Sequence, residues 1–150
     1  MNIAIGADHG GVELKAVLVK KLKSLKHTVS DKGAFSTDSC DYPVIGAAVA
    51  RALSSGKVSR GVLLCRSGAG MAIVANKFPK VRAVVCQSVE TARLCRQHND
   101  ANLLVLSADV TSPAAATAIL KTWLETPFEG GRHARRVRQI RDIEKEILHV

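Results

Sequence analysis

The feature of this sequence that most constrains its fold is the alternation of short apolar segments with longer amphipathic ones. Five short segments are rich in apolar or β-branched side chains and predict five strands: residues 2–7, 27–30, 61–65, 82–86 and 103–106. The segment 61–65 is wholly apolar, which is typical of a strand buried on both faces of a parallel sheet. Strands that alternate with helices imply right-handed crossovers. The sequence therefore predicts an α/β fold, a three-layer Rossmann-like sandwich with a five-stranded parallel sheet.

The segments between the strands have the apolar spacing of helices. Apolar residues recur every three or four positions in two series: Leu14, Val17, Leu18, Leu22 and Leu25, then Ile45, Ala48, Val49, Ala52 and Leu53. Ser88 predicts a helix cap after the fourth strand, and Ser112 with Pro113 predicts the start of a further helix. From Arg132 onward the sequence predicts an extra C-terminal helix, whose apolar side is formed by Val137, Ile140, Ile143 and Ile147.

Length and hydropathy limit the class of protein. A chain of 150 residues is expected to form one domain over residues 1–150. At this size a fold buries about 68–70% of the surface of the unfolded chain, so no metal or disulfide is needed for stability. The longest apolar stretch, residues 44–50, is far shorter than the roughly 18 residues that cross a bilayer. No Lys or Arg precedes Lys15, so we expect no secretory signal, a cytoplasmic location and no membrane partner.

Cysteine spacing and net charge narrow the chemistry further. The four cysteines form no C-x-x-C pair and are expected to be free thiols, with no structural zinc site: Cys40, Cys65, Cys86 and Cys95. The net charge of +9 is compatible with general solubility or with an anionic small molecule as substrate. Aromatic residues make up only 3% of the chain, which disfavours a nucleic-acid partner that would stack on aromatic side chains.

The most informative segment follows the third predicted strand. In parallel sheets, ligands gather at the carboxyl ends of the strands, near the switch point of the topology. There the sequence has Cys65-Arg66-Ser67-Gly68-Ala69-Gly70, and Asp8-His9 follows the first strand. Two glycines in a strand-to-helix turn let backbone N–H groups converge on an anion, and a cysteine beside them loses its proton more easily. Taken alone, the segment fits equally well a buried cysteine and a glycine-rich turn without chemistry.

Two other sets of polar residues are candidates for a site. Arg132 and Arg136 lie four apart on the C-terminal helix, so both guanidinium groups can reach one phosphate; the alternative is a solvated basic face. His98, in a polar stretch before the fifth strand, could exchange protons near neutral pH, although an isolated histidine is more often a surface residue. The other three histidines outside the first turn are interpreted as surface residues: His27, His133 and His149.

The complete series of motifs resembles one enzyme family. In order along the chain they are Asp8-His9-Gly10, Asp41-Tyr42-Pro43, Cys65-x-Ser67-Gly68-x-Gly70, Ala75-Asn76-Lys77, Arg82-Ala83-Val84, Arg96-x-His98-Asn99-Asp100-Ala101-Asn102 and Gly130-Gly131-Arg132-His133-x-x-Arg136. The chain resembles the type B ribose-5-phosphate isomerases, in the family that also contains galactose- and allose-6-phosphate isomerases. This resemblance extends over essentially the whole sequence.

The resemblance implies an aldose–ketose isomerase that works through a cis-enediolate and uses no metal and no cofactor. It implies that Cys65 is the base, since relatives that use a glutamate carry it where this chain has Met71. It implies that His98 is the acid–base group for ring opening, assisted by Asp8 and Ser67. The resemblance also implies three sets of substrate contacts. The enediolate oxygens would lie in an anion hole formed by Ser67, Gly68, Ala69 and Gly70. The phosphate would be bound by His9, Arg132 and Arg136, and the sugar would be lined by Tyr42 and Asn99.

Two positions depart from the family pattern. A small residue is common where this chain has Arg66, and an arginine that helps to bind phosphate is usual where it has Asp109. Arg66 could offset Asp109 as a substrate contact, the chain could prefer another sugar phosphate, or it could be a slow isomerase. Ribose 5-phosphate is therefore the expected substrate; a six-carbon aldose 6-phosphate and a non-catalytic role in sugar-phosphate binding are the alternatives.

The predicted topology separates two of the implied catalytic residues. His98 lies between the fourth helix and the fifth strand, at the end of the sheet opposite from Cys65. Proton transfer requires contact within about 3 Å or one intervening water. We therefore expect a homodimer in which His98 of one subunit completes the site around Cys65 of the other, as the resemblance also implies. Assembly of two such dimers is left open.

Overall fold

The computed structural model describes residues 1–148 of the chain. Five strands form one all-parallel sheet in the order β2-β1-β3-β5-β4. The strands are β1 (Asn2–Ala7), β2 (Thr28–Asp31), β3 (Arg60–Cys65), β4 (Ala83–Val85) and β5 (Leu103–Ser107). The helices are α1 (Val12–Ser24), α2 (Tyr42–Ser54), α3 (Ala69–Ala75), α4 (Val89–Asn99), α5 (Pro113–Glu125) and α6 (Arg132–Leu148), with a short 3-10 turn, η1 (His9–Gly11). None of the helices described is long and apolar enough to cross a membrane.

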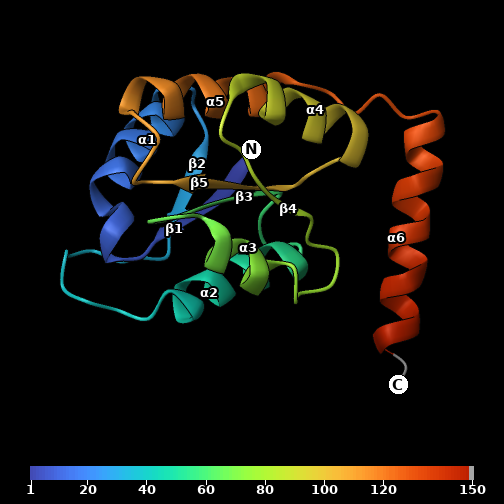
Figure 1. The fold of residues 1–150 in the computed structure, drawn as a ribbon, viewed down its shortest axis with the longest axis horizontal. Coiled ribbons are helices and arrows are strands. Elements are labelled where there is room, and N and C mark those ends of the chain that lie inside the picture. The colour runs from blue at the N-terminus through green and yellow to red at the C-terminus, as the bar shows by residue number, and fades with distance from the viewer. Residues whose placement is uncertain (149–150) are drawn as a thin grey trace.

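The sheet is the middle of three layers, as predicted. Helices α1, α4 and α5 cover one face and bury a core that includes Leu18, Leu120 and Trp123, while α2 and α3 cover the other face (Figure 1). The chain moves outward from β1 to β2 and then crosses to β3 on the other side of β1. The switch point therefore lies between β1 and β3, where Ala7 pairs with Leu64. Asp8, directly after β1, and Cys65, the last residue of β3, consequently lie on either side of the switch point.

Each predicted strand is confirmed to within one residue at either end. Ser88 Oγ accepts the Thr91 N–H and Ser112 Oγ accepts the Ala115 N–H, so both predicted caps are present. The fourth strand, predicted over 82–86, is only Ala83–Val85. It begins late because the Arg82 N–H donates to the Asn102 side chain, at 2.8 Å, rather than to a neighbouring strand.

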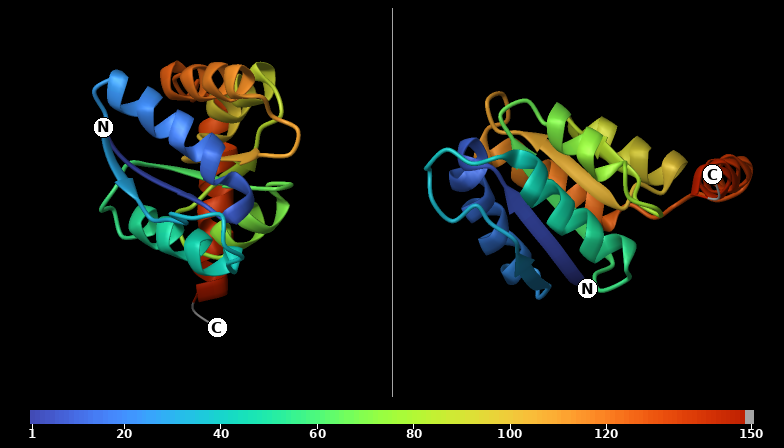
Figure 2. Two further views of the ribbon diagram at one scale, coloured as in Figure 1. Left: turned by 90° about the vertical axis from the view of Figure 1, so that its left-hand side faces the viewer. Right: turned by 90° about the horizontal axis from the view of Figure 1, so that it is seen from below.

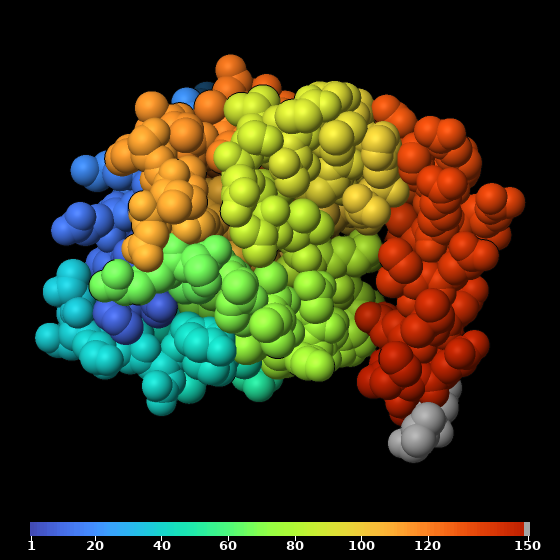
Figure 3. Space-filling view, in the orientation of Figure 1, coloured from blue at the N-terminus to red at the C-terminus, as the bar shows by residue number. Residues whose placement is uncertain are grey.

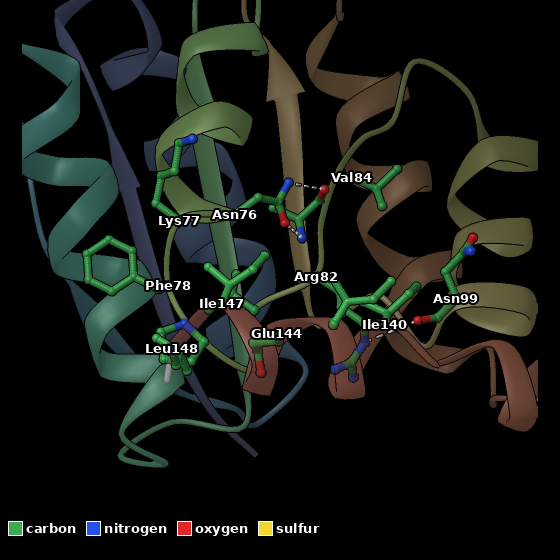
Figure 4. Close-up of a pocket in the computed structure, with 14 residues that line it drawn as sticks. Asn76, Lys77, Phe78, Arg82, Val84, Asn99, Ile140, Glu144, Ile147 and Leu148 are labelled. Carbon is green, nitrogen blue, oxygen red and sulfur yellow. Dashed lines mark hydrogen bonds between the residues drawn. The ribbon is translucent and has the colours of Figure 1, made fainter. Parts of the chain in front are cut away.

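Helix α6 lies apart from the three layers, which the sequence did not predict. Figures 1 and 2 show it standing beside the sandwich, attached through the segment after α5. Of its predicted apolar side only Val137 is buried; Ile140, Ile143 and Ile147 are 47%, 54% and 68% exposed. A groove separates these isoleucines from the main body (Figure 3) and encloses a cavity of about 550 Å³ that Phe78 and Val84 also line (Figure 4).

Candidate active site

The first group of predicted site residues meets at the switch point. The Asp8 N–H donates to the Leu64 carbonyl at 3.2 Å, which joins the end of β1 to the end of β3. Asp8 is buried, and its Oδ1 accepts the Gly10 N–H at 3.0 Å, which caps the η1 turn. His9 therefore leaves the sheet edge in a fixed direction, beside the turn that begins at Cys65.

The turn after β3 places a thiol under backbone amides. Cys65 is only 5% exposed, and the Gly68 N–H donates to its Sγ at 3.1 Å. Gly68 has a φ of +82°, a left-handed conformation that L side chains rarely adopt, so a glycine is needed to aim this amide at the sulfur. Ser67 is exposed, and its Oγ accepts the Ala69 N–H at 3.3 Å. A backbone N–H that donates to sulfur stabilises a thiolate, the form of cysteine that accepts protons.

Two neighbouring residues define the walls of this site. The ring of Tyr42, at the start of α2, lies over Gly70: a Cβ on that glycine would stand 2.6 Å from two ring carbons. Gly70 thus permits the aromatic ring to close over the turn. Met71, in the first turn of α3, is fully buried and offers no acid or base.

The orientation of His9 is set by the loop before α2. The Cys40 N–H donates to His9 Nδ1 at 3.3 Å. In its neutral form, His9 therefore carries its proton on Nε2, where the N–H can donate to an anion. The same loop is tied to the core by Lys15, which is buried, pairs with Asp31 at 2.7 Å and donates to the Ala34 carbonyl at 2.7 Å.

The two residues that depart from the family pattern contact each other. Arg66 Nη1 lies 3.7 Å from Asp109 Oδ1, and the two side chains are 68% and 52% exposed. The Arg66 side chain crosses the η1 turn, where a Cβ on Gly10 would lie 2.8 Å from its Cγ. The backbones are joined too, because the Asp109 N–H donates to the Arg66 carbonyl at 3.1 Å. Arg66 thus pairs with Asp109 at the mouth of the site, although one interpretation of the sequence was that Arg66 would offset the negative charge of Asp109 by contacting the substrate.

The second group of predicted residues gathers at the end of α4 and the start of α6. His98 stacks on His133, with ring centroids 4.3 Å apart and 10° between the planes. Arg132 and Arg136, in the first two turns of α6 like His133, are exposed. The prediction that His133 is a surface residue is wrong: it is buried, because the turn at Gly130 and Gly131, with φ of +70° and +53°, directs it toward α4. His149 lies outside the described residues.

The electrostatic surroundings of His133 favour its neutral form. Burial lowers the pKa of His133, and the charges of His98, Arg132 and Arg136 lower it further, while Glu129 acts in the opposite direction. Glu129 Oε2 lies 3.6 Å from His133 Nε2 and 4.0 Å from His98 Nε2. The ligand atoms of His98, Glu129 and His133 lie within 4.8 Å of one another, which is the spacing of a candidate metal site. However, the stacked rings are nearly parallel, so their in-plane lone pairs run side by side and do not converge as a metal site requires.

A buried ion network, which sequence reasoning missed, fixes the end of α4. Arg96 is 4% exposed; its Nη1 lies 2.8 Å from Asp100 Oδ1 and donates to the Ala101 carbonyl at 2.7 Å. Arg82 pairs with the other carboxylate oxygen of Asp100 at 3.0 Å, and its Nε donates to the Asn99 carbonyl at 3.1 Å. The spacing of Arg96 and Asp100, four apart on a helix, was the available signal. The network holds the backbone beside His98 in place.

The two groups lie at opposite ends of the sheet. In the register of β3 and β5, Cys65 pairs with Ser107 and Gly61 pairs with Leu103, and the end of α4 leads into Leu103. Four residues of strand correspond to roughly 13 Å. No hydrogen bond or ion pair formed within residues 1–148 joins the groups. In Figure 1, α6 stands on the side away from the edge where α5 begins. The structure thus brings together Asp8, His9, Tyr42, Cys65, Arg66, Ser67, Gly68, Ala69 and Gly70, and separately His98, Asn99, Arg132 and Arg136.

A buried thiol that accepts a backbone N–H, at the switch point of a parallel sheet where ligands gather, is an arrangement typical of the class of α/β enzymes. Comparison with known proteins gives the family. A family model described as Ribose/Galactose Isomerase matches residues 3–140. Ribose-5-phosphate isomerase B of Escherichia coli (strain K12) is 43% identical over 144 residues, which are 96% of this chain and 97% of that protein.

Solved structures agree with this match. The Clostridium thermocellum ribose-5-phosphate isomerase B is 46% identical, has a TM-score of 0.96 and aligns over 98% of this chain and 99% of its own. A Mycoplasma genitalium ribose-5-phosphate isomerase B with bound ribulose-5-phosphate is 37% identical, with a TM-score of 0.93 and 97% of each chain aligned. The chain belongs to the ribose/galactose isomerase family, and it is an isomerase.

Proposed function

We propose that the protein interconverts ribose 5-phosphate and ribulose 5-phosphate through a cis-enediolate. The observation that carries this proposal is the buried Cys65 thiol, which accepts the Gly68 N–H at 3.1 Å and lies beside Asp8 and His9 at the switch point. The bound ribulose-5-phosphate in the Mycoplasma genitalium relative supports the choice of a five-carbon substrate.

The proposed proton transfer uses Cys65 as the base. Its thiolate takes the proton from carbon 2 of the open-chain aldose, and the electron pair of that C–H bond moves into the enediolate. While the enediolate is held, the proton of the carbon 2 hydroxyl passes to the oxygen on carbon 1. The same thiol then returns its proton to carbon 1, which gives the ketose. The Gly68 N–H stays on the Cys65 sulfur, while the neighbouring backbone amides at Ser67, Ala69 and Gly70 are proposed to hold the negative oxygens. The loss of one such donor typically raises a barrier by roughly 2.7–4 kcal/mol. Asp8 and Ser67 orient the sugar hydroxyls.

The phosphate is proposed to bind between the two groups of residues. His9 presents its Nε2 to an anion because Nδ1 is occupied by the Cys40 N–H. Arg132 and Arg136, one turn apart on α6, add two guanidinium groups suited to phosphate oxygens. Since α6 lies at the far end of its own sheet, these arginines, with His98 and Asn99, are proposed to act in the site of a second subunit.

A homodimer with shared sites follows from this division. The apolar side of α6 supports it, because Ile140, Ile143 and Ile147 remain exposed in one chain and border a cavity that another copy could fill. The test mixes two inactive variants, Cys65→Ala and His98→Ala, after unfolding and refolding them together. Hybrid dimers then contain one intact site, and about a quarter of wild-type activity should return. No recovery in hybrids shown by mass spectrometry to have formed would contradict shared sites.

A second substrate class is favoured by the Arg66–Asp109 pair. This pair presents both a donor and an acceptor at the mouth of the site, which suits the additional hydroxyl of a six-carbon aldose 6-phosphate. The test is an isomerase assay of the purified protein on five- and six-carbon aldose phosphates with a metal chelator present. The proposal expects the highest kcat/KM with ribose 5-phosphate. A clear preference for allose or galactose 6-phosphate would replace it with the second candidate, and no turnover of any sugar would refute both.

A further inference from the structure

Three side chains form a compact unit around the predicted ring-opening residue; we name it the His98 cluster and define it as His98, Glu129 and His133. His98 stacks on His133, and Glu129 Oε2 lies 4.0 Å from one Nε2 and 3.6 Å from the other. The His133 side chain is only 7% exposed, whereas those of His98 and Glu129 are 38% and 47% exposed. The cluster therefore has a fixed, buried ring beneath a histidine that remains accessible to substrate.

The position of Glu129 relative to His98 is fixed by the backbone. The Glu129 N–H donates to the Gln97 carbonyl at 3.1 Å, one residue before His98. Positive charges act on two members of the cluster: Arg132 and Arg136 of α6 on His133, and Arg93 of α4, which also pairs with Glu90, on Glu129. Glu129 is thus the anion of the cluster, and it faces both imidazole rings at ion-pair distance.

We propose that Glu129 and His133 are positioning residues for ring opening by His98. The inference rests on the proposed function, in which the substrate arrives as a cyclic sugar. Neutral His98 takes the proton from the hydroxyl on carbon 1, the bond between carbon 1 and the ring oxygen breaks, and its electron pair stays on that oxygen. The imidazolium then gives the proton to the ring oxygen, which leaves an open-chain aldehyde and neutral His98.

The cluster is suited to the charge that appears during this step. A carboxylate 4.0 Å from the His98 ring favours the transient imidazolium, because opposite charges at this distance attract. His133 cannot share that charge readily, since burial and the nearby arginines lower its pKa and keep it neutral. It instead presents a flat neutral face on which the cationic ring can stack.

The test separates ring opening from proton transfer at carbon. Ribulose 5-phosphate carries its phosphate on the oxygen that would close a furanose ring, so it is open-chain. Exchange of its carbon 1 hydrogen with deuterium oxide, followed by NMR, therefore needs the Cys65 step but not ring opening. Conversion of ribose 5-phosphate needs both. For Glu129→Gln we expect kcat on ribose 5-phosphate to fall about 10- to 100-fold, while the rate of hydrogen exchange at carbon 1 stays unchanged. This loss is smaller than the loss of a complete acid–base residue, which contributes about 10²–10⁴-fold.

The matched control is Glu125→Gln, which removes another exposed carboxylate, at the end of α5, and should alter neither rate. His133→Phe, which keeps a flat ring, should retain more ribose 5-phosphate turnover than His133→Ala. The proposal is overturned if Glu129→Gln lowers both rates equally or lowers neither, or if the two His133 variants are equally active. A wild-type protein without ribose 5-phosphate turnover would instead refute the proposed function, which is a distinguishable result.

Discussion

Replacing Asp109 by asparagine should tighten the binding of sugar phosphates. In the folded chain Arg66 is held 3.7 Å from the Asp109 carboxylate at the mouth of the site, so its charge is partly neutralised before any substrate arrives. Asp109→Asn removes the competing anion but keeps the side-chain shape and the backbone bond to the Arg66 carbonyl. The guanidinium then becomes free to pair with the substrate phosphate.

The size of the effect follows from the exposure of the pair. With side chains 68% and 52% exposed, the pair is screened by water, and ion pairs of this kind contribute about 0.2–1 kcal/mol. The about 1.5–3 kcal/mol of a hydrogen bond to a desolvated charge does not apply here. Since about 1.4 kcal/mol corresponds to a factor of ten, KM for ribose 5-phosphate should fall by roughly 1.5- to 5-fold, with kcat little changed.

Initial rates over a range of ribose 5-phosphate concentrations measure this change at two ionic strengths. The difference between variant and wild type should shrink between about 0.1 M and 1 M salt, as the Debye length falls from about 10 Å to about 3 Å. Asp142→Asn is the matched control, since its carboxylate is 55% exposed and pairs with Lys145 away from the turn. If KM is the same in Asp109→Asn, in Arg66→Gln and in the wild type, neither residue interacts with the phosphate and the reasoning fails.

Three further predictions concern the base, the core and acid stability. Cys65→Ala should lower kcat by about 10²–10⁴-fold while calorimetry shows nearly unchanged substrate binding, and near-normal turnover would exclude Cys65 as the base. Asp31→Ala leaves the 4% exposed Lys15 charge without its partner at 2.7 Å, so urea unfolding should show a loss of about 3–5 kcal/mol; a loss below about 1 kcal/mol would contradict this. The folded-state pKa of His133 is lowered below 6.5, so the unfolded chain binds more protons. The contribution of neutral His133 to the free energy of unfolding is therefore complete above pH 6.5 and is lost as the pH falls through the folded-state pKa. Tm measured against pH should decline on acidification, and it should decline less steeply in His133→Gln.

The arrangement of strands and the first half of the site could be predicted because they depend on local pattern. Apolar runs such as 61–65 identify strands, and the rule for carboxyl ends places Asp8 and Cys65 together without further information. The same logic placed His98 away from them, as the register of β3 and β5 shows.

What escaped prediction depends on contacts between segments distant in sequence. The apolar spacing of α6 does not say which surface covers it, and Ile140 and Ile143 remain exposed in one chain. Burial of His133 results from two consecutive glycines with positive φ and from packing against α4, neither of which a single histidine in a basic segment reveals. The pairing of Arg66 with Asp109 joins residues 43 positions apart and needed the strand register.

The adjacency of β1 and β3 has a consequence for how the protein reaches its active form. Ala7 pairs with Leu64, so two strands separated by more than fifty residues must meet before Asp8 lies beside the turn of Cys65. Strands so far apart in the sequence pair slowly, because the entropy of closing a large loop is lost before any stabilising contact forms. The hydrogen bonds within a helix such as α1 are local, so helical structure can form earlier. During refolding, the far-ultraviolet circular dichroism signal should therefore recover ahead of the reactivity pattern of the Cys65 thiol, which reports the completed central pair.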